Sequence, residues 1–121
     1  MQGCDSINYC IHNCDVTNSE RFHQCVGEDL KQMKKHKIDF LIVHPPYLDI
    51  VKFTDKPEDL SGISNLNIFL EKFQVAMTNA LSYLKSKHYF VIVIGDIYRD
   101  GEVIPLGFYM MYAIKKAFKC Q

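Results

Sequence analysis

The stretch Ile38-Asp39-Phe40-Leu41-Ile42-Val43-His44-Pro45-Pro46-Tyr47 decides the fold of this chain. Its first six residues are almost continuously apolar, which is typical of a strand buried on both faces in a parallel sheet. Two consecutive prolines donate no ladder hydrogen bonds and disfavour helical geometry in the preceding residue, so the strand must end at His44. A second apolar run, from Tyr89 to Ile94, stops at Gly95-Asp96 and predicts a second buried strand.

Two helices are expected around these strands. From Ser64, a predicted N-cap, apolar residues recur at three- and four-residue spacing to about Lys87, which indicates an amphipathic helix. After a turn at Arg99-Asp100-Gly101, Pro105 suits the first position of a second helix. Residues 48–63 are expected to form an ordered surface loop with a short helical piece, and long loops in compact domains are usually functional.

The part of the chain before Ile38 gives weaker signals. Asp5 or Ser6 is predicted to cap a short helix over residues 7–14. A polar connection follows, and residues 22–26 predict a short strand with Glu28 and Asp29 at its end. The resulting order of elements favours an α/β fold with a parallel sheet and flanking helices, in which ligands bind beyond the carboxyl ends of the strands.

Composition limits what kind of protein this is. The 121 residues, 48% of them hydrophobic and 23% charged, suit a single globular domain and argue against disorder. Fourteen Lys and Arg balance fourteen Asp and Glu, so a nucleic-acid role would need a local patch of positive charge. No apolar run approaches the length of a bilayer span and the first residues lack the pattern of a signal peptide, so we expect a cytoplasmic protein with no membrane partner.

The five cysteines argue for reduced thiols or metal ligands rather than a disulfide framework. The first quarter of the chain contains six possible soft metal ligands: Cys4, Cys10, His12, Cys14, His23 and Cys25. A small zinc-binding module is therefore an alternative function. Its spacing fits none of the paired Cys-x-x-Cys patterns, so we assign no metal ligand.

Taken together, these motifs resemble the DNA amino-methyltransferases, the family that methylates N6 of adenine or N4 of cytosine. The resemblance covers roughly the whole length after Ile38 and rests on four segments: Val43 to Phe53, Glu58-Asp59-Leu60-Ser61, Val93 to Asp96, and Gly101 with Ile104 to Phe108. It implies a partial Rossmann-like methyltransferase fold. It also implies transfer of a methyl group from S-adenosylmethionine to the exocyclic amine of a flipped DNA base.

The resemblance assigns roles to the motif His44-Pro45-Pro46-Tyr47. An exocyclic amine is a poor nucleophile because its lone pair is delocalised, so the enzyme must hold the flipped base with that nitrogen toward the methyl group. By analogy with the family, His44 and the Pro45 carbonyl accept hydrogen bonds from the amine and Tyr47 stacks on the base. The alternative for this motif is an ordinary strand end with a rigid turn. For Asp96, the alternative is that it orients the neighbouring loop without touching a ligand.

His44 replaces the Asp, Asn or Ser that is common at this position in the family. Only a neutral imidazole can accept a hydrogen bond from the amine, so activity is expected to fall below about pH 6.5.

On the cofactor side, the resemblance assigns Asp5 to the ribose hydroxyls and Glu28 or Asp29 to the adenine amine, with His44 adjoining them. The alternatives are a helix N-cap role for Asp5 and solvated loop positions for the other two acids. The first strand and glycine-rich loop of the family have no counterpart in the sequence. The resemblance therefore implies the middle of a methyltransferase, either a catalytic-domain fragment or a split subunit that needs a complementing chain to bind S-adenosylmethionine. The strand Ile38 to Val43 would then present an open edge, and the chain is expected to form a homo-oligomer or to aggregate.

Overall fold

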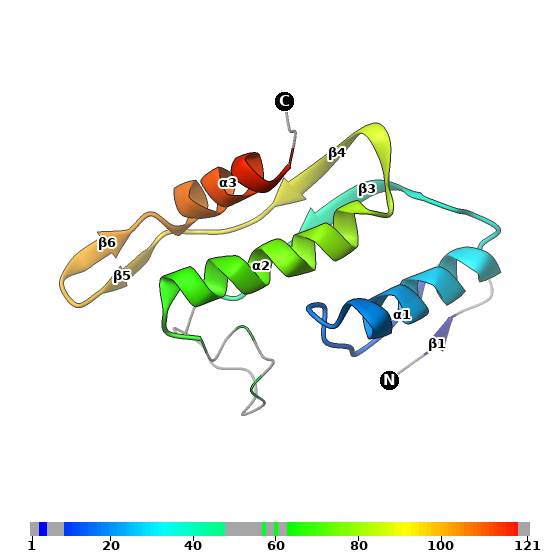
Figure 1. The fold of residues 1–121 in the computed structure, drawn as a ribbon, viewed down its shortest axis with the longest axis horizontal. Helices are drawn as coiled ribbons and strands as arrows, with labels where there is room; N and C mark the ends of the chain where they lie inside the picture. The colour runs from blue at the N-terminus through cyan, green and yellow to red at the C-terminus, as the bar shows by residue number, and fades with distance from the viewer. Residues whose placement is uncertain (1–2, 5–8, 48–56, 58–59, 61–62, 119–121) are drawn as a thin grey trace.

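The computed structural model describes residues 3–4, 9–47, 57, 60 and 63–118, and in this part the chain has an α/β fold. Three helices and three two-stranded sheets are present among these residues (Figure 1). In chain order the elements are β1 (Gly3–Cys4), β2 (Cys10–Ile11), α1 (Ser19–Gln32), β3 (Ile38–Val43), α2 (Leu66–Leu81), β4 (Leu84–Ile92), β5 (Ile97–Arg99), β6 (Glu102–Ile104) and α3 (Leu106–Ala117).

The central sheet is the parallel pair β3 and β4, which confirms the two strands expected from the apolar runs. The chain leaves β3 and returns through α2 before it enters β4, so both strands run in the same direction and end at the same edge. A hydrogen bond from the Val93 N–H to the Val43 carbonyl, 2.8 Å long, continues the pairing just past the end of β4.

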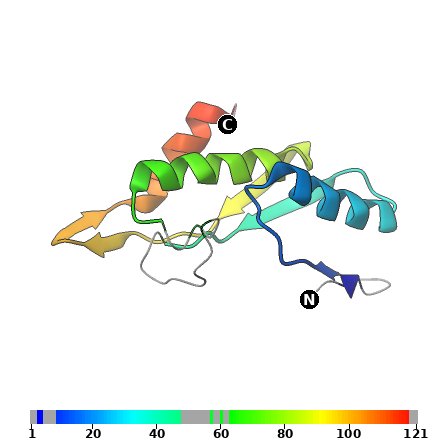
Figure 2. The same ribbon diagram turned by 60° about the horizontal axis from the view of Figure 1, so that its bottom comes forward.

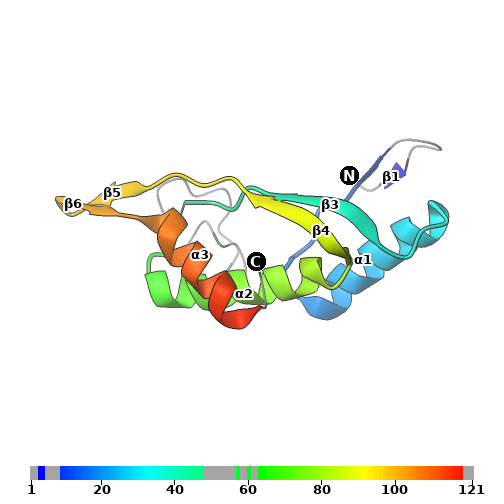
Figure 3. The same cartoon turned by 90° about the horizontal axis from the view of Figure 1, so that it is seen from above.

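The helices lie on one side of this pair, and no described helix covers the opposite face (Figure 3). Side chains of the inner face pack against a core built around Phe69, Phe73 and Met77 of α2 and Leu106 and Met110 of α3. The large apolar side chains of the other face are exposed, and we call them the outer face: Phe40, Ile42, Tyr89, Val91 and Val93. The predicted burial on both faces is therefore wrong, because only one face meets helices in the described structure.

The expected helix after Ser64 is present as α2, but it begins and ends elsewhere than predicted. Asn65 is its N-cap and accepts a hydrogen bond from the Ile68 N–H through its side chain. The helix ends at Leu81 because Ser82 caps it, and the Ser82 hydroxyl bonds to the Asn79 carbonyl at 2.7 Å. Residues 84–87, predicted as helix, belong to β4.

The hairpin of β5 and β6 confirms the turn predicted at Asp100-Gly101. Both residues have positive φ, 53° and 83°, as a two-residue hairpin turn of this hand requires. The hairpin projects beyond the end of the central strands (Figures 1 and 2). It leads into α3, where Pro105 occupies the N-cap position, one residue before its predicted place inside the helix.

The predictions for the N-terminal part need correction. Residues 22–26 are not a strand but the middle of α1, which Asn18 caps by accepting a hydrogen bond from the Arg21 N–H. The apolar residues Phe22, Cys25, Val26 and Leu30 follow helical spacing, and α1 packs on α2, so tertiary contact outweighs the cost of Gly27 inside the helix. Cys10 and Ile11 form a strand instead of the predicted helix, whereas Asp5 and Ser6 lie outside the described residues.

Candidate functional site

The candidate site lies where β3 and β4 end. The chain leaves β3 through His44-Pro45-Pro46-Tyr47 and leaves β4 through Ile94-Gly95-Asp96, so the parallel pairing brings these two segments together at one edge of the sheet. Among the sequence-predicted site residues, these are the ones that the fold unites.

Tyr47 connects the two segments. Its hydroxyl lies 3.4 Å from Nε2 of His44, and the two rings meet edge-on with centroids 5.9 Å apart. The same hydroxyl lies 3.9 Å from the position that a Cβ atom on Gly95 would occupy. A Cβ atom at this position would make an ordinary van der Waals contact with the hydroxyl, so Tyr47 and Gly95 are neighbours across the two segments.

Exposure differs along the motif in a way that suits a binding edge. His44 is exposed, Pro45 is buried, and Tyr47 is half-buried, with its ring packed against the hydrophobic core. The buried proline and the core contact hold the backbone, while His44 and Asp96 are both exposed. A neutral imidazole and a carboxylate can each accept a hydrogen bond from a ligand.

Glu28 and Asp29 do not join this edge. Both lie in the second half of α1, which ends shortly before β3 begins, so they lie toward the opposite end of the sheet (Figure 1). The prediction that they follow a strand is wrong. Asp29 instead holds His12, whose Nε2 lies 2.8 Å and 2.7 Å from the two carboxylate oxygens. Nδ1 of His12 is buried and has no hydrogen-bond partner among the described residues.

The described residues do not assemble a complete site for S-adenosylmethionine. Of the side chains assigned to this cofactor, His44 lies at the carboxyl edge, Glu28 and Asp29 lie away from it, and Asp5 is outside the described residues. The motif stretch from Leu48 to Phe53 is also outside them. Within the described part, one histidine and one acid at the edge are too few to bind both a ribose and an adenine ring.

The cysteines behave differently from one another. Cys10 is disulfide-bonded, so the expectation of reduced thiols is wrong for this residue, whereas Cys14 and Cys25 are free. Burial raises the pKa of the Cys14 thiol, and its hydrogen bond and charge interaction with Cys25 raise it further. No group of three or more His, Cys, Asp or Glu side chains in the described residues has the arrangement of a metal site.

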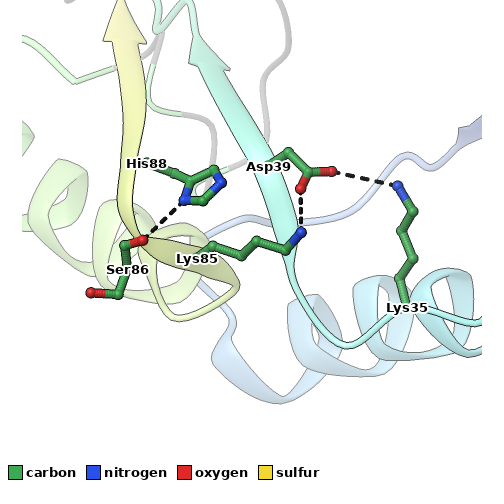
Figure 4. A network of polar contacts seen from close by, with 5 residues as sticks. All are labelled: Lys35, Asp39, Lys85, Ser86 and His88. Atoms are coloured by element: carbon green, nitrogen blue, oxygen red, sulfur yellow. Dashed lines mark hydrogen bonds and ion pairs between the residues drawn. The ribbon is translucent and has the colours of Figure 1, made fainter.

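A charged network that the sequence did not reveal lies at the amino end of the sheet (Figure 4). Asp39 of β3 pairs with Lys85 of β4 and, at 3.5 Å, with Lys35. The hydrogen bond from Lys85 and its positive charge hold the pKa of Asp39 below its ordinary value. His88 bonds to the Ser86 carbonyl at 2.9 Å beside this network. Only the folded chain brings positions 39 and 85 together, so no local pattern could have predicted the pair.

Comparison with known proteins adds no relative: no family model, no curated protein and no solved structure matches this chain significantly. Within the described residues, no helix combines the length and apolar character needed to cross a bilayer.

Proposed function

We propose that this chain is the target-base half of a DNA amino-methyltransferase of the Rossmann-like class, acting in the cytoplasm on adenine or cytosine. His44 and the Pro45 carbonyl accept hydrogen bonds from the exocyclic amine, and Tyr47 contacts the face of the flipped base. Pro46 completes the rigid motif. S-adenosylmethionine is held mainly by a complementing chain.

One observation carries this proposal: an exposed imidazole at the end of a parallel strand, braced by a half-buried tyrosine, beside the Gly-Asp end of the neighbouring strand. The proline between them is buried, which supports a fixed direction for its carbonyl. A rigid acceptor pair beside an aromatic ring suits a planar base with an amino group, because the ring supplies stacking and the acceptors choose the amine.

The need for a complementing chain is supported by the exposed sheet. Five large apolar side chains of the outer face are exposed, and β3 pairs with β4 alone among the described strands. Contiguous exposed apolar surface of this kind usually marks an interaction site. A second protein, or a second copy of this chain, that covered the outer face would bring its own residues to the carboxyl edge.

The base-binding role is tested by nuclear magnetic resonance titration with 9-methyladenine and 1-methylcytosine. We expect saturable shifts at the amides of Tyr47 and Gly95 for one of these bases. The dimethylamino analogue of that base has no amine hydrogen to donate and should bind about tenfold more weakly, the loss expected for one hydrogen bond of about 1.4 kcal/mol. Binding of the dimethylamino analogue as tight as that of the parent base would contradict the proposal.

Two variants separate an acceptor role from a structural one. His44→Asn keeps a hydrogen-bond acceptor and should retain binding, whereas His44→Leu removes it and should lose about tenfold. Equal binding by His44→Leu and by the natural chain would remove His44 from the site.

A further inference from the structure

A groove of about 400 Å³ runs between β4 and α3 and reaches Ile94, next to Gly95 of the candidate base site. Its walls are the inner-face side chains Phe90, Ile92 and Ile94 on one side and Met110, Met111 and Ile114 of α3 on the other, with Gly107 at the contact of the two walls. Lys115 is the charged residue among those that line it. The groove is therefore apolar along its length and cationic at one place.

The groove adjoins a strand edge that has no partner in the described structure. Among the described strands β4 pairs only with β3, and α3 lies on the side of β4 away from β3 (Figure 1). Val93 donates its N–H to β3, and successive residues of a strand direct their N–H groups to opposite edges, so those of Ile92 and Ile94 point away from β3. Ile92 and Ile94 thus each contribute an apolar side chain to the groove and a backbone N–H to the edge that has no partner among the described strands.

The apolar groove and the strand edge together indicate which kind of ligand binds here. An aliphatic ligand would fill the groove but would leave the backbone groups of β4 unpaired, which is costly once water is excluded. An extended peptide satisfies both, because its backbone pairs with the edge and alternate side chains enter the groove. From Phe90 to Ile94 the edge is about 13 Å long, which matches a strand of about five residues.

Lys115 defines one further property of this peptide. Its ammonium group is exposed and forms no ion pair in the described part of the chain. We propose that the groove between β4 and α3 binds an extended apolar strand of another protein chain, with an acidic residue of that strand at Lys115. The groove adjoins the base site at Ile94 but does not include His44, Pro45 or Tyr47, and the inference does not depend on the proposed methyltransferase function.

The test uses a fluorescent peptide of about nine residues, a common strand length, with valine and threonine in alternation and one glutamate near its end. We expect saturable anisotropy changes with the natural chain. Two further peptides are methylated on every second backbone nitrogen, one on the odd-numbered residues and one on the even-numbered residues, so that the side chains are unchanged. The peptide that loses the N–H groups facing β4 should bind at least about tenfold more weakly than the unmodified one. Decanoate is the competing probe for a lipid-like ligand.

Charge exchange tests the acidic residue. Lys115→Glu should weaken the peptide about tenfold, and a peptide with lysine in place of glutamate should restore binding to this variant. Lys116→Glu is the matched control, because it changes the net charge equally at the next exposed position and does not line the groove. Met111→Glu should also weaken the peptide, since it places a charge in the apolar wall.

Several results would overturn the inference. These are the absence of saturable peptide binding up to about 1 mM, equal effects of the Lys115 and Lys116 variants, and equal affinity for both N-methylated peptides and the unmodified one. Decanoate that bound more tightly than the peptide would instead identify a lipid site. If the natural chain self-associated in sedimentation and Lys115→Glu abolished this, the groove would bind a second copy of this chain instead. His44→Leu should leave peptide binding unchanged, so failure here and failure of the base site are distinguishable.

Discussion

The hydroxyl of Ser19, the first residue of α1, donates a 2.8 Å hydrogen bond to the side-chain oxygen of Asn79 in α2. The amide nitrogen of Asn79 donates in turn to the Val16 carbonyl at 2.9 Å. Asn79 is 4% exposed and is the buried polar residue of the described chain. One carboxamide therefore fixes both the start of α1 and the turn before it against the central helix, across 60 residues of sequence.

Replacing this carboxamide should loosen the N-terminal part. Asn79→Ala removes the donor from the part-buried Val16 carbonyl, so the free energy of unfolding should fall by about 1 kcal/mol in urea titration. Thr78→Ala is the control, because Thr78 is exposed and bonds only within its own helix; it should change stability by less than about 0.5 kcal/mol. Equal losses in the two variants would show that the link between the helices contributes little.

The outer face should drive self-association. Ile42 is 65% exposed and Tyr89 is 80% exposed, and both lie in this face with three further large apolar side chains. The double variant Ile42→Thr, Tyr89→Thr keeps residues that favour strands and removes much of the apolar area, so sedimentation should show at least about tenfold weaker association. Tyr98→Thr, at a strand position that is 69% exposed but outside this face, should leave association unchanged. A natural chain that stays monomeric at high concentration would contradict this prediction.

The ion pairs of Asp39 predict how stability changes with pH. Because its pKa is lower in the folded chain than its ordinary value of 3.8, Asp39 stabilises the fold above that pH and loses this contribution as the pH falls through the folded value. Asp39→Asn should therefore lower the melting temperature slightly at about pH 7 and have no effect at about pH 2. Since the group is exposed, high salt should reduce the difference. The exposed Glu71→Gln in α2 is the control, and an effect of Asp39→Asn that persisted in acid would contradict the ion-pair explanation.

The Cys14 thiol should react slowly with iodoacetamide. Its pKa is raised by burial and by Cys25, and the thiolate is the reactive form, so peptide mapping after labelling at about pH 8 should show less modification than an ordinary thiol gives. Cys25→Ala removes the second cause, so the pKa of Cys14 should fall and its labelling should become faster. Val26→Ala changes the neighbouring position but keeps Cys25, and it should leave the rate unchanged. Slower labelling of Cys14 in Cys25→Ala would contradict the explanation that Cys25 raises the pKa of Cys14.

Local patterns in the sequence were sufficient for most of the elements after Ile38. The continuous apolar run and the two prolines predicted β3 and its end, and the run before Gly95 predicted the second half of β4. Periodicity predicted α2 and α3, and Arg99-Asp100-Gly101 predicted a turn but not the strands β5 and β6 on either side of it. These features depend on backbone chemistry and spacing within a few residues, which is why no tertiary information was needed. The juxtaposition of His44 to Tyr47 with Gly95 also followed, because parallel strands share an edge.

Other features depended on contacts between distant segments. Residues 22–26 look like a strand within a short window and become helix because Asn18 caps the segment and α1 packs on α2. The role predicted for Asp29 rested on that strand, and the folded chain pairs this acid with His12 instead.

The sequence by itself determined the two central strands, the two helices after Ile38 and which two strand ends meet at the candidate site, but neither the start of β4 nor the strands β5 and β6. Only the tertiary structure decided which faces of those strands are buried. An apolar run records that a strand has hydrophobic side chains on both faces, but burial depends on what lies against each face. Here α2 and α3 cover one side, so the outer face and the groove beside β4 remain open for the partners proposed above.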